Sequence, residues 1–306
     1  MVTVLLAVYN GEKYLSAQIE SILCQTEQNF KIIIRDDGSR DNSPAIIKEY
    51  AEKYPDKISV MKGTPTGSAA TNFATMLEVC DDDYIMFCDQ DDVWLPFKIE
   101  KTLAAMKSAE GDNKNIPVLV HGDLSVVDEK LNITAPSFFK FQRLYQQNVS
   151  FPHLLVQNYV TGCTVMINRA LKQKCGSVPE NCAMHDWWLA LIAQLFGKIV
   201  CINEPLMLYR QHTDNQVGAK ASYGFALIRR KLATLGEVKK NYQATYTQAE
   251  ILKTRYLNEL DESDSEILSA YCSMKRKNKL QKLCLMNKYD FKKGTTLRII
   301  GQYFLM

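Results

Sequence analysis

A short apolar run that ends in three carboxylates constrains this chain more than any other feature. Tyr84 to Cys88 is long enough for a buried strand, and Asp89, Asp91 and Asp92 follow it at once. Because an unpaired buried charge is very costly, these carboxylates must emerge where the strand ends and a cation can neutralise them. Carboxylate oxygens suit Mg²⁺ or Mn²⁺, ions that commonly hold substrate phosphates. The sequence therefore predicts a metal–diphosphate site at the carboxyl end of a strand, where α/β sheets bind their ligands.

Strands and helices alternate over the N-terminal third of the chain. Apolar, β-branched segments predict strands, and apolar residues three and four apart predict helices. The predicted strands are Val2–Val8, Phe30–Ile34, Ile58–Met61 and Tyr84–Cys88, and the predicted helices are Tyr14–Cys24, Ala45–Lys53, a helix that Gly67-Ser68 opens and that runs to Val79, and Phe97–Met106. This alternation indicates βαβ units, and hence an α/β fold with a mostly parallel central sheet flanked by helices.

The remainder is less regular. Strands are predicted over Val118–His121, Val160–Ile167 and Lys198–Ile202, with a helix over Met184–Phe196. Beyond Gln216, long polar–apolar stretches with few glycines predict helices. The chain is therefore expected to hold an α/β domain over residues 1–218 and a basic helical C-terminal region over residues 219–306.

Charge is divided unevenly between these two parts. Residues 220–306 hold 17 Lys and Arg against 8 Asp and Glu, whereas residues 1–219 hold 20 against 26. A basic region on an acidic body indicates a charged partner surface, such as anionic lipid, nucleic acid or an acidic protein. A solvated helical face gives the same pattern.

The nine cysteines and the N-terminal residues indicate the cellular compartment. The cysteine number is odd and no two cysteines form a CxxC pair, which is typical of reduced thiols. The N-terminus lacks the basic leader and apolar region of a signal peptide, and no apolar stretch is long enough to span a bilayer. We therefore expect a cytoplasmic protein.

Four motifs together resemble a known family. They are Val8-Tyr9-Asn10, Asp36-Asp37-Gly38-Ser39, Asp89-Gln90-Asp91-Asp92 and His185-Asp186-Trp187-Trp188. In order and spacing they resemble the inverting family 2 glycosyltransferases of the GT-A fold, over roughly residues 1–215. Together with Tyr209-Arg210-Gln211-His212, they look most like the rhamnosyltransferase-like bacterial members, which make cell-wall or capsular polysaccharide.

The resemblance implies a nucleotide site. Asp37 would accept a hydrogen bond from the imide N–H of uracil or thymine, unless it only stabilises the turn before Gly38. Asn72 would lie near the nucleotide, although it could equally cap a helix. The other residues implied in nucleotide-sugar binding are Ala7, Tyr9, Asn10, Asp89, Gln90 and Arg210.

The resemblance also implies a site for Mn²⁺ or Mg²⁺. Asp91 would bind the metal directly, and Asp89 would reach the ribose or a metal-bound water. His212 would be a further ligand, and the adjacent Arg210 would bind phosphate oxygens. Asp92 is instead interpreted as the cap of the helix that follows Pro96.

Asp186 is implied to be the general base, which takes the proton of the acceptor hydroxyl during inverting transfer. His185 would orient or support it, and here replaces the Glu that commonly precedes the base. Trp187 is assigned to the acceptor and Trp188 to the core. Asp123 and Gly162 are assigned to sugar contact.

The sequence thus predicts a metal-dependent transferase that moves a sugar from dTDP-rhamnose or a UDP-hexose to a saccharide or polyprenyl-linked acceptor. A nucleotidyltransferase is a weaker alternative, because the first strand lacks the expected basic, glycine-rich loop. A non-catalytic sugar-nucleotide-binding protein of the same fold is another. No nucleic-acid partner is expected. The basic helices are expected to contact a membrane peripherally or to form a homodimer.

Overall fold

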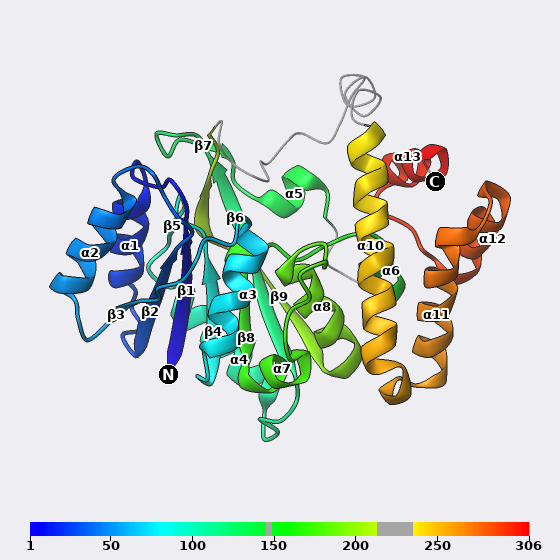
Figure 1. Ribbon diagram of the computed structural model, residues 1–306, viewed down its shortest axis with the longest axis horizontal. Coiled ribbons are helices and arrows are strands. Elements are labelled where there is room, and N and C mark those ends of the chain that lie inside the picture. The colour runs from blue at the N-terminus through cyan, green and yellow to red at the C-terminus, as the bar shows by residue number, and fades with distance from the viewer. Residues whose placement is uncertain (145–148, 213–234, 306) are drawn as a thin grey trace.

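Strands of one central sheet occupy the middle of the molecule (Figure 1). The structure is a computed structural model that describes residues 1–144, 149–212 and 235–305. Within these ranges the sheet has nine strands in the order β3-β2-β1-β4-β8-β6-β9-β5, and β7 pairs with β6. The strands are β1 Val2–Val8, β2 Phe30–Asp36, β3 Ile58–Val60, β4 Tyr84–Cys88, β5 Val93–Trp94, β6 Val118–Val127, β7 Ile133–Ala135, β8 Met166–Asn168 and β9 Lys198–Arg210.

The N-terminal part of the sheet is parallel, and this directs its loops to one edge. β1 pairs in parallel with β2 on one side and with β4 on the other, and β2 pairs in parallel with β3. β8 is antiparallel to both β4 and β6, and β6 and β9 are parallel again. Val8 lies level with Asp36, and Leu6 lies level with Cys88. The loops that follow β1, β2 and β4 therefore leave the sheet side by side, as the sequence predicted.

Helices cover both faces of this sheet and extend it at one end. They are α1 Leu15–Leu23, α2 Ser43–Lys53, α3 Ala69–Val79, α4 Lys98–Glu110, α5 Phe138–Gln142, α6 Phe151–Val156, α7 Arg169–Cys175, α8 His185–Phe196, α10 Leu235–Tyr256, α11 Glu262–Ser273, α12 Lys279–Tyr289 and α13 Thr296–Leu305. The predicted fold class, a mostly parallel α/β sheet of the GT-A type with a helical C-terminal extension, is confirmed.

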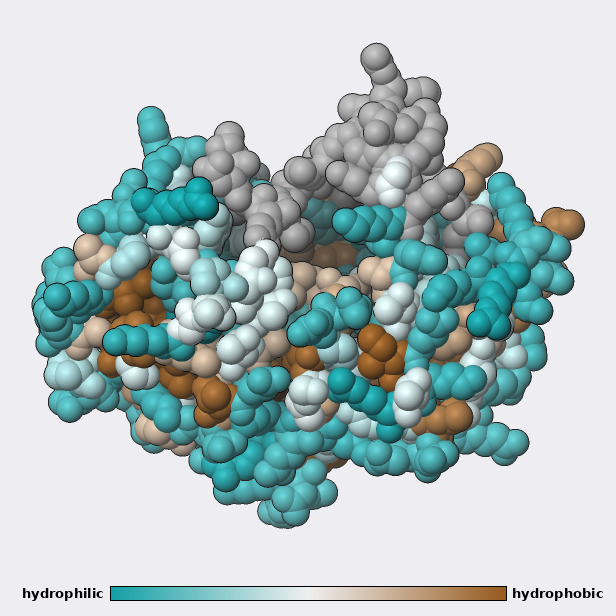
Figure 2. Space-filling model, in the orientation of Figure 1, coloured by the Kyte–Doolittle hydropathy of each residue, from teal (hydrophilic) through white to brown (hydrophobic). Residues whose placement is uncertain are grey.

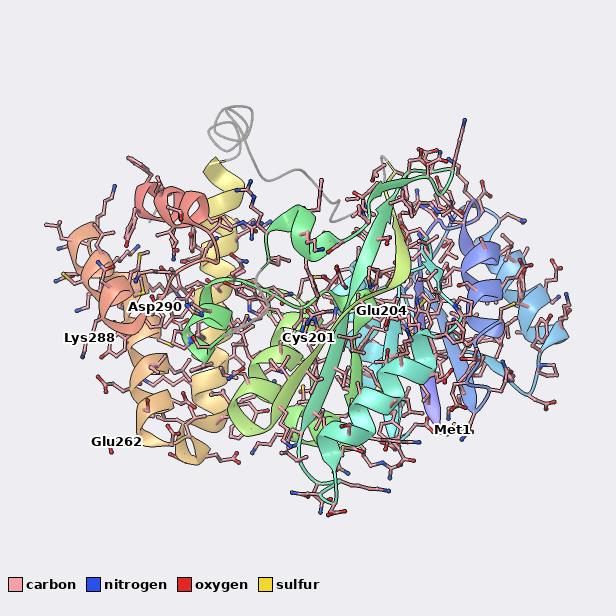
Figure 3. All side chains as sticks on the ribbon, turned by 180° about the vertical axis from the view of Figure 1, so that it is seen from behind. Met1, Cys201, Glu204, Glu262, Lys288 and Asp290 are labelled. Atoms are coloured by element: carbon pink, nitrogen blue, oxygen red, sulfur yellow. The ribbon has the colours of Figure 1, made fainter. Side chains whose placement is uncertain are left out.

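Alternation along the strands creates two cores. In β1, Leu5 and Ala7 face one core, whereas Val4 and Leu6 face the other, because successive side chains point to opposite faces of a strand. The first core also holds α3 and α8, and the second holds α1 and α4. In Figure 1, α3 lies in front of the sheet, and the view from behind in Figure 3 brings α4 forward.

The C-terminal helices share the first of these cores. Tyr246 and Leu252 of α10, Tyr271 of α11 and Phe291 are buried in one cluster with Trp188 of α8. Asp290 lies beside α6 in Figure 3, where its Oδ2 is 3.0 Å from His153 Nε2. The predicted boundary at residue 218 and the basic cluster Arg229-Arg230-Lys231 lie outside the described residues. None of the helices described is both long enough and apolar enough to cross a bilayer.

One predicted strand was wrong in part. Val160–Ile167 is not a continuous strand, because residues Gly162–Thr164 form a 3₁₀ turn before β8 begins at Met166. The Thr164 N–H and hydroxyl both donate to the carbonyl of Thr161, at 2.9 and 2.7 Å, which curls the backbone there. The short helices α5, α6 and α7 and the strands β5 and β7 were not predicted.

The end of α8 provides a test of this packing. A Cβ on Gly197 would lie 1.8 Å from the carbonyl oxygen of Pro117, which already accepts the Lys198 N–H. Gly197→Ala should therefore lower the free energy of unfolding by about 1–3 kcal/mol or more, since the clash is with backbone. Gly236→Ala in α10 is the matched control, because nothing lies within 4 Å of its Cβ position. Equal denaturation midpoints for the two variants would contradict the placement of Gly197.

Candidate active site

A cavity of about 1620 Å³ opens where the parallel strands end. A pocket for one small ligand usually has roughly 300–1000 Å³, so this cavity has room for two substrates. In Figure 2 the surface is hollowed between the sheet and the C-terminal helices. The predicted site residues that line the cavity are Ala7, Tyr9, Asn10, Asp37, Asn72, Asp89, Gln90, Asp91, Gly162, His185, Asp186, Trp187 and His212.

Asp37 follows β2 and is almost fully buried. Its Oδ1 accepts from Arg35 Nη1 at 3.1 Å and from the N–H and hydroxyl of Thr66 at 2.6 and 2.9 Å. Its Oδ2 accepts from the Gly67 N–H at 2.9 Å. Burial alone would raise the pKa of Asp37, but these hydrogen bonds outweigh burial and lower it. Asp37 therefore stays ionised, and Oδ2 keeps a second acceptor position toward the cavity.

Arg35 and Asn72 hold this carboxylate in place. Arg35 Nη1 also donates to Asn72 Oδ1 at 2.7 Å, and Nη2 donates to the carbonyl of Thr64 at 2.7 Å. Ser68, not Asn72, caps α3, since the Ser68 side chain accepts the N–H of Thr71. The capping alternative for Asn72 was therefore wrong. Asn72 instead fixes the guanidinium that supports Asp37.

The loop after β1 is clamped to the loop after β4. Gln90 Oε1 accepts the Tyr9 N–H at 2.6 Å, and Gln90 Nε2 donates to the Tyr9 carbonyl at 2.8 Å. Asn10 has a positive φ of 50°, and its Oδ1 accepts the Arg40 N–H at 2.8 Å. This loop is therefore rigid and forms a fixed rim of the cavity.

Asp91 and His212 meet across the cavity floor. His212 Nε2 lies 2.8 Å from Asp91 Oδ2, and both side chains are about nine-tenths buried. The imidazole also packs on the ring of Tyr14, with 5.0 Å between ring centroids. Asp89 lines the same floor, where burial and the negative charges of Asp91 and Asp186 raise its pKa. A cation bound here would offset this repulsion.

Two sets of metal-ligating side chains share Asp89. Asp89, Asp92 and Cys163 place one ligand atom each within 4.8 Å of one another. However, burial raises the pKa of the Cys163 thiol, so it stays protonated. Asp91 and His212 both line the cavity and offer the oxygen and imidazole donors that Mn²⁺ and Mg²⁺ accept. Among the described residues, however, Asp89, Asp91 and His212 do not bring three ligand atoms within 4.8 Å of one another, so an ion held by this predicted set would require at least one of these side chains to move.

Asp92 is not a helix cap, which corrects its interpretation. It is fully buried, and its Oδ1 accepts the backbone N–H of Arg210 at 3.1 Å, which ties the loop after β4 to β9. α4 begins later, at Lys98, with Phe97 at its cap position.

Asp186 stands at the first turn of α8. Its Oδ1 accepts the Trp187 N–H at 2.6 Å, and the Asn158 side chain and Gly162 backbone also donate to the carboxylate. Burial dominates these bonds and raises the pKa of Asp186 to about 6. The absence of a side chain at Gly162 permits this approach, since a Cβ there would lie 3.3 Å from Asp186 Oδ2. A carboxylate with this pKa can accept a proton near neutral pH.

His185 packs against two aromatic rings that also contact each other, next to Asp186. Its ring centroid lies 4.6 Å from that of Phe73 and 5.1 Å from that of Phe87. Burial lowers its pKa to about 3, so the imidazole is neutral. Neither ring nitrogen has a hydrogen-bond partner among the described residues. His185 lines the cavity, but both nitrogens have almost no accessible surface, so a ligand would reach them only after a side-chain movement.

The two tryptophans separate as predicted. Trp188 is fully buried in the core, whereas Trp187 lines the cavity. The Trp187 Nε1–H donates to the carbonyl of Leu154 at 2.6 Å, which fixes the indole plane.

Two predicted residues are not brought to the cavity. The Asp123 carboxylate accepts the N–H groups of Leu124 and Phe139 and the hydroxyl of Ser137, so it supports the start of α5. The Arg210 side chain donates to the carbonyls of Asp91 and Glu129 at 2.9 and 2.7 Å. Its guanidinium therefore joins two loops, and neither sugar contact by Asp123 nor phosphate binding by Arg210 is supported.

Three supporting residues were missed in the sequence. Lys98 is buried below the aspartates, where its Nζ donates to the Cys163 carbonyl at 2.6 Å and lies 4.2 Å from the centroid of the Trp94 ring. Arg35 holds Asp37, and Tyr14 packs on His212. Arg35 and Lys98 could have been found in the sequence, because each is a charged residue at a position of a strand or helix that faces the core.

Comparisons with known proteins agree with this architecture. Residues 3–173 match the family described as glycosyl transferase family 2. The chain is 28% identical over 235 residues to the dTDP-rhamnosyl transferase RfbG of Shigella flexneri, covering 71% of this chain and 75% of RfbG.

Two solved structures share the fold. S. aureus TarS residues 1–349 in complex with UDP-GlcNAc superposes with a TM-score of 0.59 at 16% identity, covering 89% of this chain and 71% of TarS. The mannosyltransferase PcManGT of Pyrobaculum calidifontis, in complex with GDP-Man and Mn²⁺, gives a TM-score of 0.50 at 17% identity, covering 94% of this chain and 84% of PcManGT. Because the family match spans more than half of the chain and includes its aspartate-ended strand, this protein belongs to glycosyl transferase family 2.

Proposed function

We propose that this chain transfers a sugar, with inversion, from a nucleoside-diphosphate donor to a hydroxyl of a saccharide or polyprenyl-linked acceptor. One observation carries the proposal: Asp37, the Asp91–His212 pair and Asp186 line one cavity. These groups provide a base contact, a diphosphate site and a proton acceptor in a single space. Membership in the family favours glycosyl transfer over nucleotidyl transfer.

The nucleotide is proposed to bind at the Asp37 end. The ionised Asp37 Oδ2 would accept the imide N–H of uracil or thymine, next to the rigid loop of Tyr9 and Asn10. RfbG is named a dTDP-rhamnosyl transferase and TarS was solved with UDP-GlcNAc. These relatives support dTDP-rhamnose or a UDP-linked sugar as the donor, and cell-surface polysaccharide synthesis is proposed as the process.

Asp89, Asp91 and His212 are proposed to hold Mn²⁺ or Mg²⁺, and PcManGT was solved with Mn²⁺. A divalent ion supplies Lewis-acid stabilisation of the departing diphosphate. Asp186 takes the proton of the acceptor hydroxyl as that oxygen attacks the anomeric carbon. The bond from that carbon to the diphosphate oxygen breaks, and the nucleoside diphosphate leaves without protonation by an acid.

A cytoplasmic location with peripheral membrane contact is proposed through α12 and α13. Leu280, Ile300 and Phe304 are exposed on these helices, and hydrophobic side chains project from this edge in Figure 2. Lys279 Nζ lies 5.9 Å from the centroid of the Phe304 ring. Exposed apolar side chains beside lysines suit the surface of an anionic membrane.

Replacing Asp91 tests the metal site. Asp91→Asn should abolish Mn²⁺-dependent binding of UDP and dTDP in titration calorimetry, because it removes a charged ligand. Asp112→Asn, an exposed aspartate in a loop outside the cavity, is the matched control and should bind as the wild type does. Unchanged binding by Asp91→Asn would remove Asp91 from the metal site.

Replacing Asp186 tests catalysis. Asp186→Asn should lower kcat by about 10²–10⁴ while donor affinity stays near that of the wild type. The base must be deprotonated and burial raises its pKa to about 6, so wild-type kcat/KM should rise with pH and level off above about 6. Glu180→Gln, an exposed acid shortly before α8, is the control. Near-normal turnover by Asp186→Asn would remove Asp186 from the mechanism.

Replacing His185 tests contact with the transferred sugar. His185→Phe keeps an aromatic ring packed against Phe73 and Phe87 but removes both nitrogens. The thermal unfolding midpoint should stay the same or rise, because unpaired buried nitrogens are costly. KM for the sugar nucleotide should rise about 2–10-fold while affinity for the nucleoside diphosphate alone is kept.

The control for this variant is His121→Phe. His121 is also a buried neutral histidine with an unpartnered Nδ1, but it does not line the cavity. Its variant should keep the wild-type KM. The same KM for both variants would show that His185 makes no sugar contact.

A further inference from the structure

The part of the cavity wall built by the C-terminal helices has a distinct charge. Among the described residues from α10 onward, the charged side chains that line the cavity are Lys293 and Arg298, and no acid lines it there. The acids of the lining all come earlier in the chain: Asp37, Asp89, Asp91, Glu129 and Asp186. The earlier part of the lining is of mixed charge, since Lys13 and Arg40 line it beside these acids, whereas the part from α10 onward is cationic among the described residues.

The cationic part is held in a fixed geometry. Gln302 is 1% exposed, its Oε1 accepts the Lys293 N–H at 3.1 Å, and its Nε2 donates to the Phe291 carbonyl at 2.8 Å. The Lys293 Nζ lies 4.6 Å from the centroid of the Tyr242 ring, which also lines the cavity. A buried amide thus ties the backbone of Lys293 to α13, and an aromatic face supports its ammonium group.

Arg298 completes this arrangement from α13. It lies one turn before Gly301 and Gln302, so the three residues share one face of the helix. Its Nη2 donates to the carbonyl of Gln142 at 3.0 Å, which orients the guanidinium. Gly301 adds no side chain beside it. Burial lowers the pKa of Arg298.

Residues 157–162 connect this region to the catalytic base. The Asn158 side chain and the Gly162 backbone donate to Asp186. Gln157 Oε1 accepts the Gly294 N–H at 3.3 Å, and a Cβ on Gly294 would lie 2.9 Å from the hydroxyl of Tyr159. Neighbouring residues of one segment therefore touch the base and the loop that carries Lys293. Lys293 and Arg298 line the same cavity as Asp186, and residues 157–162 join the two regions.

We propose that Lys293 and Arg298 bind a phosphate or diphosphate group of the acceptor; this subsite rests on the function proposed above. A guanidinium fork and an ammonium group suit phosphate oxygens, whereas a neutral sugar needs no such pair of cations. The phosphate can belong to a lipid or to a sugar phosphate. α13 favours the lipid, because Ile300 and Phe304 are exposed on the face opposite Arg298.

Titration calorimetry in EDTA tests the subsite without the metal. Farnesyl phosphate and glucose 1-phosphate serve as probes for the two sources. Each of Lys293→Met and Arg298→Met should weaken binding of the preferred probe about tenfold or more, as loss of a charged hydrogen bond does. Lys288→Met is the charge-matched control, because Lys288 pairs with Glu266 on the surface. Arg298→Lys keeps the charge and should lose less affinity for the probe. This variant keeps the test valid if Arg298→Met does not fold.

The outcomes separate this subsite from the proposed function. Mn²⁺-dependent binding of UDP or dTDP should stay at the wild-type level in the Lys293 and Arg298 variants. If neither probe binds the wild type, or if the variants bind as tightly as Lys288→Met, the subsite is overturned while donor binding stands. If the wild type binds neither UDP nor dTDP in the presence of Mn²⁺, the proposed function is overturned instead.

Discussion

Repulsion among carboxylates at one edge of the sheet is the constraint that shapes this site. The parallel register of β1, β2 and β4 brings Asp37, Asp89, Asp91 and Asp92 to neighbouring loops. Buried like charges disfavour one another and favour protonation. The protein offsets part of this charge with residues of its own: Arg35 binds Asp37, and Lys98 lies below Asp92 and Asp89. The negative charge that remains, on Asp89 and Asp91, lines the cavity and would be stabilised by a cation from solution.

Asp186 differs from these aspartates in the kind of partner it has. Asp37 is paired with a guanidinium, and its pKa is low. Asp186 accepts from neutral N–H donors of Trp187, Gly162 and Asn158, and burial raises its pKa to about 6. A paired carboxylate is a poor proton acceptor, whereas one held by neutral donors can take a proton and release it. The neighbours of each aspartate thus suit the role proposed for it, recognition for Asp37 and proton transfer for Asp186.

The sequence correctly predicted the site residues whose position depends on where a strand ends or a helix begins. It did not predict residues whose side chains hydrogen-bond to nearby backbone instead of lining the cavity. Asp91 and Asp186 reach the cavity because they follow a strand and open a helix, features visible as an apolar run or a helical period. Asp123 also follows an apolar segment, yet β6 continues past it to Val127 and its carboxylate turns to α5. Arg210 was expected to bind a phosphate group, but its guanidinium donates to the backbone carbonyls of Asp91 and Glu129. Such contacts come from loops whose path no local pattern specifies.

The family match covers only part of the residues that line the cavity. Residues 3–173 match the family and include Asp37, Asn72, Asp89 and Asp91, the side of the donor. Asp186, His212 and the cationic wall of α13 lie beyond that match. A shared donor half is compatible with different acceptors, because acceptor contacts come from the helices that follow. Since those helices share a core with α8, a change in their packing would also move the first turn of α8, and with it the base. The proposed acceptor wall and the proposed base are therefore coupled through this core, and the proposed nucleotide pocket around Asp37 also touches it, because Phe73, Met76 and Leu77 of α3 belong to the same cluster.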